Sequence, residues 1–478
     1  MKLSKPETIF LLILFLAAFL RFYHISDQVP LIGDQGRDFI AARDFVLTGN
    51  IPLLGIASSV PRFHQGPLYI WLIATIFKLF GFSPLGPIIF ASALGLITVG
   101  LTYILTDRHF GRLPAIIASL TLAASPLAVL QSRMAFHTNA IPLFALIYLY
   151  SLIYLLQNKH SNLFWPSLAF ALLFQFELVV APLMLLIPLV MFITKYKPRI
   201  HQLASALLGL IIGLLPQLVY DLTHHFQQVG LFIVWIGYRL AGFVGFGGGH
   251  TASPAKFITV IKLIFTYSQK FFIWQSAPIT VLILLTLSIG LFKLRKKLTP
   301  LVMILLAWMA IMLISFIVMG NASEAYFPAL FVPVAILLGL SINTYSHQAR
   351  FLLTVSIILL ALINTSFLVT TSFLTGPVSS TNPLNTYGAP LSEQLSITTL
   401  ISQQASNNYS LTALGPGSQF PSFLDNYRYL LWWQTGQAES PTGQKVWVQP
   451  SYLTIRPTDT ISYSFLTTTI SFPLNNSN

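Results

Sequence analysis

The chain of 478 residues contains no cysteine, which excludes disulfide bonds and metal sites built on thiolates and leaves the cellular compartment open. Charge is also scarce, because Asp, Glu, Lys and Arg together make up 8% of the residues. With 55% hydrophobic residues and a mean hydropathy of +0.74, the chain is too apolar for an ordinary soluble protein. This composition indicates a membrane protein.

Nucleotide-binding motifs are missing as well. The sequence has no P-loop and no GxGxxG motif followed by a helix, so no nucleotide is expected at its site. A net charge of +13 would suggest nucleic acid as a partner of a soluble protein. Here the basic residues lie in short clusters between apolar runs, a pattern typical of cytoplasmic loops, so nucleic acid is not expected.

The apolar runs predict an α-helical, polytopic membrane protein. A hydrocarbon core about 30 Å thick needs roughly 20 apolar residues per crossing, and on this basis we expect about eleven transmembrane helices. The first run follows a basic start, as in a signal peptide, but no small-x-small cleavage site follows it, so we interpret it as a retained helix. The candidate spans lie near 8–25, 86–106, 113–131, 138–157, 163–178, 179–194, 202–221, 273–292, 299–319, 326–343 and 351–372.

The basic clusters fall on alternate sides of these spans and so predict the orientation. Placing them in the cytoplasm gives a protein of the plasma (inner) membrane with a cytoplasmic N-terminus. The outer side then holds the loop 26–85, the turn 131–137, the loop 222–272 and the tail. The clusters are Lys2 with Lys5, DRHFGR (107–112), NKH (158–160), KYKPR (195–199), FKLRKK (292–297) and HQAR (347–350).

Two domains are predicted, a transmembrane domain (1–372) and a small extracytoplasmic α/β module (373–478). The module begins where the composition changes to Ser, Thr, Asn, Gln and Pro. Its helices are expected at 389–405 and 421–434, its strands at 409–415 and 445–449, and its Thr/Ser/Asn-rich end is expected to be frayed. The outer loop 26–85 carries a short apolar stretch, PLYIWLIATIFKLFG, which suits an interfacial helix.

The outer loop also concentrates the scarce acids. The stretch GDQGRDFIAARDF (33–45) predicts an amphipathic helix at the membrane surface, with Phe39 on its apolar side and Asp34, Arg37 and Asp38 on its polar side. Asp34, in the first turn, is either an N-cap or a general base facing an acceptor hydroxyl. Arg37 either pairs with these acids or holds a phosphate.

Further candidates lie at the predicted outer ends of other segments. Arg62, His64 and Gln65 approach the same surface from the far end of the loop, an arrangement that suits a lipid-phosphate substrate. Ionisable residues are costly in a membrane, so those near the spans are also candidates, although each could instead be locally paired or snorkelling. These are Arg133, beside His137 and Asn139, together with Glu177, Asp221, His224 and Glu324.

Two other features stay open at this stage. Asp and His could bind a divalent metal, but HExxH or a similar spacing is absent, so the metal is unknown. The glycine run at 245–249 could cradle a phosphate, but a mobile linker or lid is the preferred interpretation.

The motifs in residues 1–345 together resemble those of the membrane-embedded GT-C glycosyltransferases, in the family 39-like branch with protein O-mannosyltransferases and lipid A aminoarabinose transferases. Asp34 and Arg37 match an Asp-Glu-x-Arg pattern, with Gln35 in place of Glu. Gly66 to Tyr69 match Pro-Pro-Leu-Tyr, with Gln65 in place of the preceding His or Lys. Arg133 matches the arginine of an "SR" turn.

A fourth motif begins at Tyr326, where AYFP is similar to an Arg/His-Tyr-x-x-Pro stretch but lacks the Arg or His and has Glu324 nearby. The resemblance implies transfer of a sugar from a polyprenyl-phosphate donor to an acceptor hydroxyl of a glycan, lipid or protein, with Asp34 as the base. It implies donor contacts from Arg37, Arg62, His64, Gln65, Tyr69, Arg133 and Asn139. A lipid-linked saccharide transporter, a polysaccharide polymerase and a non-catalytic scaffold are the alternatives.

Overall fold

The computed structural model describes most of the chain. The described residues are 5–58, 62–158, 162–243, 254–274, 276–370, 389–405, 408–415, 418–451 and 457–474. The glycine run at 245–249 lies outside them, so its role as a lid stays a prediction.

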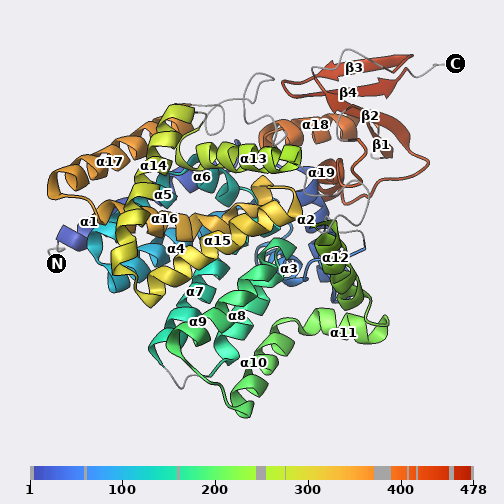
Figure 1. Ribbon diagram of the computed structural model, residues 1–478. Coiled ribbons are helices and arrows are strands. Elements are labelled where there is room, and N and C mark those ends of the chain that lie inside the picture. Colours follow the sequence, from blue (N-terminus) through green and yellow to red (C-terminus); the bar gives the residue numbers. More distant parts are fainter. Residues whose placement is uncertain are drawn as a thin grey trace.

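Helices make up the chain from α1 (Lys5–Phe22) to α17 (His347–Thr370) (Figure 1). The helices between them are α2 (Gly33–Thr48), α3 (Leu68–Phe80), α4 (Leu85–Phe110), α5 (Arg112–Ala124), α6 (Pro126–Arg133), α7 (Ile141–Gln157), α8 (Phe164–Phe174), α9 (Leu186–Thr194), α10 (Ile200–Gly213), α11 (Leu215–Thr223), α12 (Gln227–Phe243), α13 (Pro254–Phe272), α14 (Ala277–Leu294), α15 (Pro300–Met319) and α16 (Pro328–Asn343). Short 3-10 helices are η1 (His137–Ala140), η2 (Leu178–Leu185), η3 (Arg295–Lys297) and η4 (Glu324–Tyr326).

The protein is a multi-pass membrane protein, but it has fewer full-length spans than predicted. Among the described residues, five helical segments are long and apolar enough to cross a membrane, or up to seven if two bent pairs each count as one span. The bent pairs are α5 with α6 (57°) and α10 with α11 (78°). The count of about eleven also included α1, whose 18 residues contain Lys5, Glu7 and Arg21, and three apolar helices of at most 17 residues. Hydropathy alone does not reveal how long each helix is inside an apolar run. The short helices are Phe164–Phe174, Leu178–Thr194 and Pro328–Asn343.

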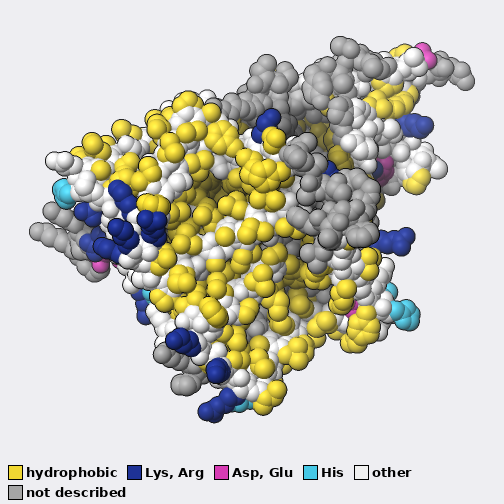
Figure 2. Space-filling view, in the orientation of Figure 1, with side chains coloured by type: hydrophobic (Ala, Val, Ile, Leu, Met, Phe, Trp, Pro, Cys, Tyr) yellow, Lys and Arg dark blue, Asp and Glu magenta, His cyan; other side chains and the backbone are white. Residues whose placement is uncertain are grey.

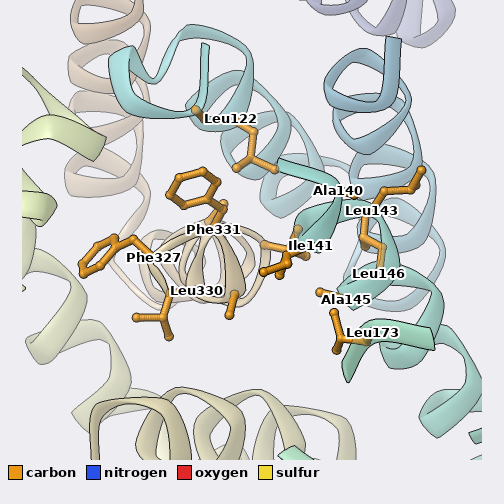
Figure 3. Close-up of a cluster of buried hydrophobic side chains, with 14 of the residues drawn as sticks. Leu122, Ala140, Ile141, Leu143, Ala145, Leu146, Leu173, Phe327, Leu330 and Phe331 are labelled. Carbon is orange, nitrogen blue, oxygen red and sulfur yellow. The ribbon is translucent and has the colours of Figure 1, made fainter. Parts of the chain in front are cut away.

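The core of the helical part is built around α16, which is buried along almost its whole length. A helix that is apolar on all sides belongs inside a bundle. Gly339 allows α16 to approach α5 closely, since a Cβ there would lie 2.5 Å from the carbonyl oxygen of Pro114. Figure 3 shows Leu330 and Phe331 of α16 in the same buried cluster as Leu122 of α5.

The apolar surface and the basic residues are separated on the outside of the molecule. Figure 2 shows a broad hydrophobic face with Lys and Arg side chains gathered at its left end and lower edge, the end at which the N-terminus lies. One basic cluster lies at the end of α14 and in η3, where the exposed residues are Lys293, Arg295, Lys296 and Lys297. This asymmetry agrees with a basic cytoplasmic side, while the orientation itself stays a prediction.

The C-terminal module combines two helices with a four-stranded mixed sheet. Helices α18 (Leu391–Gln404) and α19 (Asp425–Thr435) form where they were predicted, as do the first two strands. The strand order is β1-β2-β4-β3, with β1 parallel to β2 and the other pairs antiparallel. The strands are β1 (Tyr409–Ala413), β2 (Gln444–Pro450), β3 (Thr460–Ser464) and β4 (Thr468–Pro473).

The prediction of a frayed end was wrong for β3 and β4. Their hydroxyl side chains pair across the strands, with Ser462 Oγ and Ser471 Oγ 2.7 Å apart. Such cross-strand pairs stabilise the sheet, and Ile470 and Phe472 of β4 are buried in the core of the module.

The module packs onto the loop 26–85 of the helical part. The ring of Tyr429 in α19 stacks on Phe77 of α3 at 5.8 Å between centroids and meets Phe39 of α2 edge to face at 5.2 Å. Its hydroxyl donates to the carbonyl oxygen of Phe82 at 2.6 Å. In Figure 1, α18 and α19 lie beside the start of α2. The module therefore covers the loop that holds Asp34.

Candidate active site

Helix α2 carries most of the charge of the outer loop, and its sequence explains its ends. The Gln35 side chain accepts from the backbone N–H of Ile32 at 2.8 Å, which satisfies a donor at the helix start. Gly49 takes a φ of 75° just after the last helical residue, the left-handed conformation that often ends a helix. Asp34 lies inside the first turn, where the helix dipole favours a carboxylate, and Ile32 occupies the N-cap position.

Asp34 is both fixed and reachable. Its Oδ1 accepts from Arg37 Nη1 at 3.1 Å and from Ser422 Oγ of the C-terminal module at 2.6 Å. The side chain is still 40% exposed. These contacts leave the N-cap alternative without support, because the hydrogen bonds of the carboxylate go to side chains.

Asp38, predicted on the polar side of α2, is completely buried. Its Oδ1 accepts from Nε and Nη2 of Arg37, at 3.2 and 3.1 Å. Burial raises the pKa of Asp38, and the nearby Arg37 and His137 offset this only in part. Burial acts to lower the pKa of Arg37, but the charges of Asp38 and Asp34 outweigh it, so that pKa is raised. Arg37 therefore stays protonated between the two carboxyl groups.

A line of buried polar side chains continues inward from Asp38. His137 Nδ1 lies 3.9 Å from Asp38 Oδ2, and His137 Nε2 lies 3.5 Å from Glu177 Oε2. Glu177 Oε1 accepts from Gln65 Nε2 at 2.9 Å. Among the described residues, neither Asp38 Oδ2 nor His137 Nδ1 has a hydrogen-bond partner. The imidazole thus separates two carboxylates, each of which an imidazolium would stabilise.

The turn after α8 holds the Gly66–Tyr69 motif in place. Gln175 accepts through Oε1 from the N–H of Leu68 at 3.1 Å, and through its carbonyl oxygen from the N–H of Gly66 at 3.0 Å. A Cβ at Gly66 would lie 2.3 Å from Gln175 Oε1, so the close approach requires glycine. This contact sets Gln65 and the buried Tyr69 at the start of α3.

Arg133 and Asn139 lie apart from this line. The guanidinium of Arg133 is fully buried and donates to carbonyl oxygens of Leu20, Arg21, Tyr23 and His24 at the end of α1, at 2.8–3.3 Å. Asn139 Nδ2 donates to the carbonyl oxygen of Met134 at 2.6 Å. In this structure both side chains donate hydrogen bonds to backbone carbonyl oxygens. Their contact with a sugar donor stays a prediction.

Arg62 and His64 lie beside the start of α12 instead. The backbone N–H of His64 donates to Gln228 Oε1 at 2.8 Å, and the carbonyl oxygen of Arg62 accepts from Gln228 Nε2 at 3.1 Å. Asp221 accepts from two backbone N–H groups at the first turn of α12, at 2.7 and 2.9 Å. His224 is exposed and stacks on Tyr220 at 3.9 Å between ring centroids.

Glu324 and Tyr326 form a third group, at the start of α16. Glu324 Oε2 pairs with Lys270 Nζ of α13 at 2.7 Å, and its carbonyl oxygen accepts from Gln131 Nε2 at 3.0 Å. Tyr326 is buried, with its ring 6.4 Å from that of Phe316. Glu324 thus forms an ion pair with a lysine from another helix.

No metal site is evident in the part of the chain that the structure describes. No group of three or more His, Asp or Glu side chains converges there as metal ligands would. Asp38, His137 and Glu177 are close neighbours, but the imidazole lies between the carboxylates and contacts both. Their arrangement fits ion pairing better than shared coordination.

The structure thus brings together six of the predicted residues and separates the rest. The joined residues are Asp34, Arg37, Asp38, Gln65, Tyr69 and Glu177. His137 was noted in the sequence only as a neighbour of Arg133, although its place in a polar stretch just before a span was a usable signal. Ser422 carried no signal, because its contact with Asp34 joins residues 388 positions apart.

Two solved structures share this architecture over nearly the whole chain. The crystal structure of ArnT from Cupriavidus metallidurans bound to undecaprenyl phosphate superposes with a TM-score of 0.61 at 12% identity, covering 97% of each chain. The apo state of ArnT gives 0.60 at 13% identity, again over 97% of each. The chain has an ArnT-like fold.

Sequence comparison agrees with this fold over a shorter segment. Residues 64–220 match the model of the family described as dolichyl-phosphate-mannose-protein mannosyltransferase. Two uncharacterized proteins of Aquifex aeolicus (strain VF5) are 26% and 28% identical over 160 and 141 residues. Each match covers 32% of the relative, so the chain matches about a third of their length. The resemblance predicted from the motifs is confirmed.

Proposed function

We propose that this protein is a glycosyltransferase that moves a sugar from a polyprenyl-phosphate donor to an acceptor hydroxyl at the outer face of the membrane. The observation that carries the proposal is the carboxylate of Asp34, held by the cation Arg37 and 40% exposed. An exposed acid beside a cation suits an acceptor hydroxyl and the phosphate of a lipid-linked donor. ArnT, the similar structure, was crystallised with undecaprenyl phosphate.

The chemistry follows from these two side chains. The acceptor oxygen forms a bond to the anomeric carbon while its proton passes to Asp34. The bond from that carbon to the phosphate oxygen breaks, and its electron pair stays on the departing polyprenyl phosphate. Arg37, the nearest cation to Asp34, stabilises the charge that develops on the phosphate. No nucleotide takes part, in keeping with the lack of nucleotide-binding motifs.

The sugar and the acceptor stay open, and so does the assignment of further donor contacts. Among the predicted donor ligands, Gln65 and Tyr69 lie on the same polar line as Asp34, which supports their place in the site. Arg62 and His64 lie on the other side of the loop, next to α12.

The test is donor consumption by the purified protein in lipid nanodiscs, supplied with a panel of undecaprenyl-phosphate hexoses. The wild type is compared with Asp34→Asn, which keeps the shape of the side chain but removes the base. We expect the variant to lose at least about a hundredfold in rate, the order of magnitude of general-base catalysis. Asp44→Asn is the matched control, since Asp44 lies on the same helix, is 53% exposed and pairs only with Arg43 among the described residues.

The other outcomes are equally informative. Equal rates for wild type and Asp34→Asn would assign the base to another residue. If the wild type consumes no donor and binds no undecaprenyl phosphate, the enzyme proposal fails.

A further inference from the structure

The C-terminal module contacts α2 at the residues that surround Asp34, and the proposed reaction by itself does not explain this contact. The turn before α19 brings Ser422 Oγ to 2.6 Å from Asp34 Oδ1. Asp425, at the start of α19, is close enough to Arg37 to raise the pKa of the guanidinium. The module thus reaches both members of the predicted catalytic pair.

Buried hydrogen bonds fix the module against Leu31, two residues before α2 begins. The carbonyl oxygen of Leu31 accepts from Gln394 Nε2 of α18 at 2.7 Å and from Asn426 Nδ2 of α19 at 3.2 Å. Asn426 Nδ2 also donates to Gln394 Oε1 at 2.7 Å. All three residues are buried, and breaking such a network leaves desolvated polar atoms behind. The arrangement of the module on α2 is therefore specific.

Two glycines of α2 make room for this contact. A Cβ at Gly33 would lie 1.9 Å from the carbonyl oxygen of Ser422, and a Cβ at Gly36 would lie 2.1 Å from the backbone nitrogen of Asn426. Both glycines are inside a helix, where glycine is otherwise unfavourable, so close approach is the reason for them. The two glycines of the sequence GDQG therefore allow the module to pack closely against α2 beside Asp34.

We propose that Ser422 is a positioning residue for Asp34, an inference that rests on the proposed function. Ser422 of the C-terminal module and Arg37 of α2 both donate to Asp34 Oδ1, and these two hydrogen bonds fix the orientation of the carboxylate. Among the described residues Oδ2 has no hydrogen-bond partner, so it is the oxygen that takes the proton of the acceptor hydroxyl as the acceptor oxygen attacks the sugar. The polyprenyl phosphate leaves with the electron pair of the broken bond.

A simple docking role for the serine hydroxyl is the competing explanation. Docking has other sources, namely the aromatic contacts of Tyr429 and the hydrogen bonds to Leu31. Loss of the hydroxyl should then leave the module attached and change mainly the rate. Ser422→Thr retains a hydroxyl at the same position and is the conservative variant.

The experiment measures kcat and the donor KM of full-length protein in nanodiscs for wild type, Ser422→Ala, Ser422→Thr and Asp34→Asn, with an undecaprenyl-phosphate hexose that the wild type consumes. We expect Ser422→Ala to lower kcat about tenfold, the worth of one hydrogen bond to a charged group, with KM and melting temperature unchanged. Ser422→Thr should restore most of the rate. Ser396→Ala, an exposed serine of α18, is the control and should match the wild type.

The results separate the two proposals. If Ser422→Ala keeps the wild-type kcat while Asp34→Asn is inactive, the positioning role is overturned and the function stands. The positioning role is equally overturned if Ser422→Thr is as slow as Ser422→Ala, or if Ser422→Ala changes only the melting temperature. If Asp34→Asn is fully active, the base assignment fails and the inference falls with it.

Discussion

Asp34 and Asp38 lie one turn apart on α2 and share Arg37, but they can do different things. Asp34 is open enough to meet a substrate, whereas Asp38 is completely enclosed and touches Arg37 and His137. Asp38 therefore contacts Arg37, which donates to it through Nε and Nη2. A buried partner of this kind keeps the guanidinium in one orientation.

The raised pKa of Asp38 gives a pH-dependent prediction. A carboxyl whose folded pKa is raised binds more protons in the folded state than in the unfolded one, between the ordinary pKa of 3.8 and the raised value. The free energy of unfolding therefore falls as pH rises through that window. In Asp38→Asn this contribution is absent, so the melting temperature of the wild type should fall relative to the variant as pH rises from about 4.

Thermal unfolding of both proteins in detergent from pH 4 to pH 8 checks this, with Asp44→Asn as the reference for an exposed acid on the same helix. A difference between wild type and Asp38→Asn that stays constant over the range would contradict the prediction.

Arg133 allows two roles to be told apart. Its guanidinium donates to four carbonyl oxygens at the end of α1, so Arg133→Gln should lower the free energy of unfolding by about 2 kcal/mol, the scale of one or two charge-assisted hydrogen bonds. Thermal unfolding measures the loss, and Lys296→Gln, at an exposed position, serves as the control. An unchanged melting temperature together with weaker binding of undecaprenyl phosphate would favour the phosphate role that the family motif implies.

At the scale of elements, the contact between α2 and α19 depends on the absence of a side chain at Gly36 of α2. Gly36→Ala places a methyl group where Asn426 lies and must push the module away. We expect a loss of at least about 1 kcal/mol in stability, as for other overpacked sites, and a slower transfer of sugar although Asp34 is intact. Gly230→Ala in α12 is the matched control, because no described atom lies within 4 Å of its Cβ, and it should be neutral or slightly stabilising. If Gly36→Ala keeps the stability and rate of the wild type, the module can shift to accommodate the methyl group and the prediction is wrong.

Sequence patterns predicted the positions of the helices better than the burial and long-range contacts of their side chains. The period of apolar residues located α2 and α3, and the motif positions gave Asp34 with Arg37. Asp38 was misplaced, because a polar residue on a helix predicts solvent unless a partner such as Arg37 and a covering domain are known. Ser422 could not be found, since nothing local in a turn of the polar tail indicates a contact with α2. The short spans were overcounted because Pro182 and similar breaks interrupt helices inside apolar runs.

At the scale of the whole molecule, the basic residues at one end and the module at the other predict opposite exposures across the membrane. The natural absence of cysteine allows single reporters, Lys296→Cys and Ser396→Cys, without background. In intact spheroplasts a membrane-impermeant maleimide should label Ser396→Cys, and it should label Lys296→Cys only after the membrane is opened. The reverse pattern would invert the orientation predicted from the charge clusters.

The distance along the chain between Asp34 and Ser422 has a consequence for biosynthesis. The two residues that meet at Oδ1 are 388 positions apart. At a synthesis rate of about 5–20 residues per second, the second residue leaves the ribosome roughly 20 to 80 s after the first. During that interval the nascent protein has Asp34 but not the hydroxyl that donates to it. The contact can form only after the C-terminal module has reached the side of the membrane on which Asp34 lies, and a chain truncated before Ser422 would lack it.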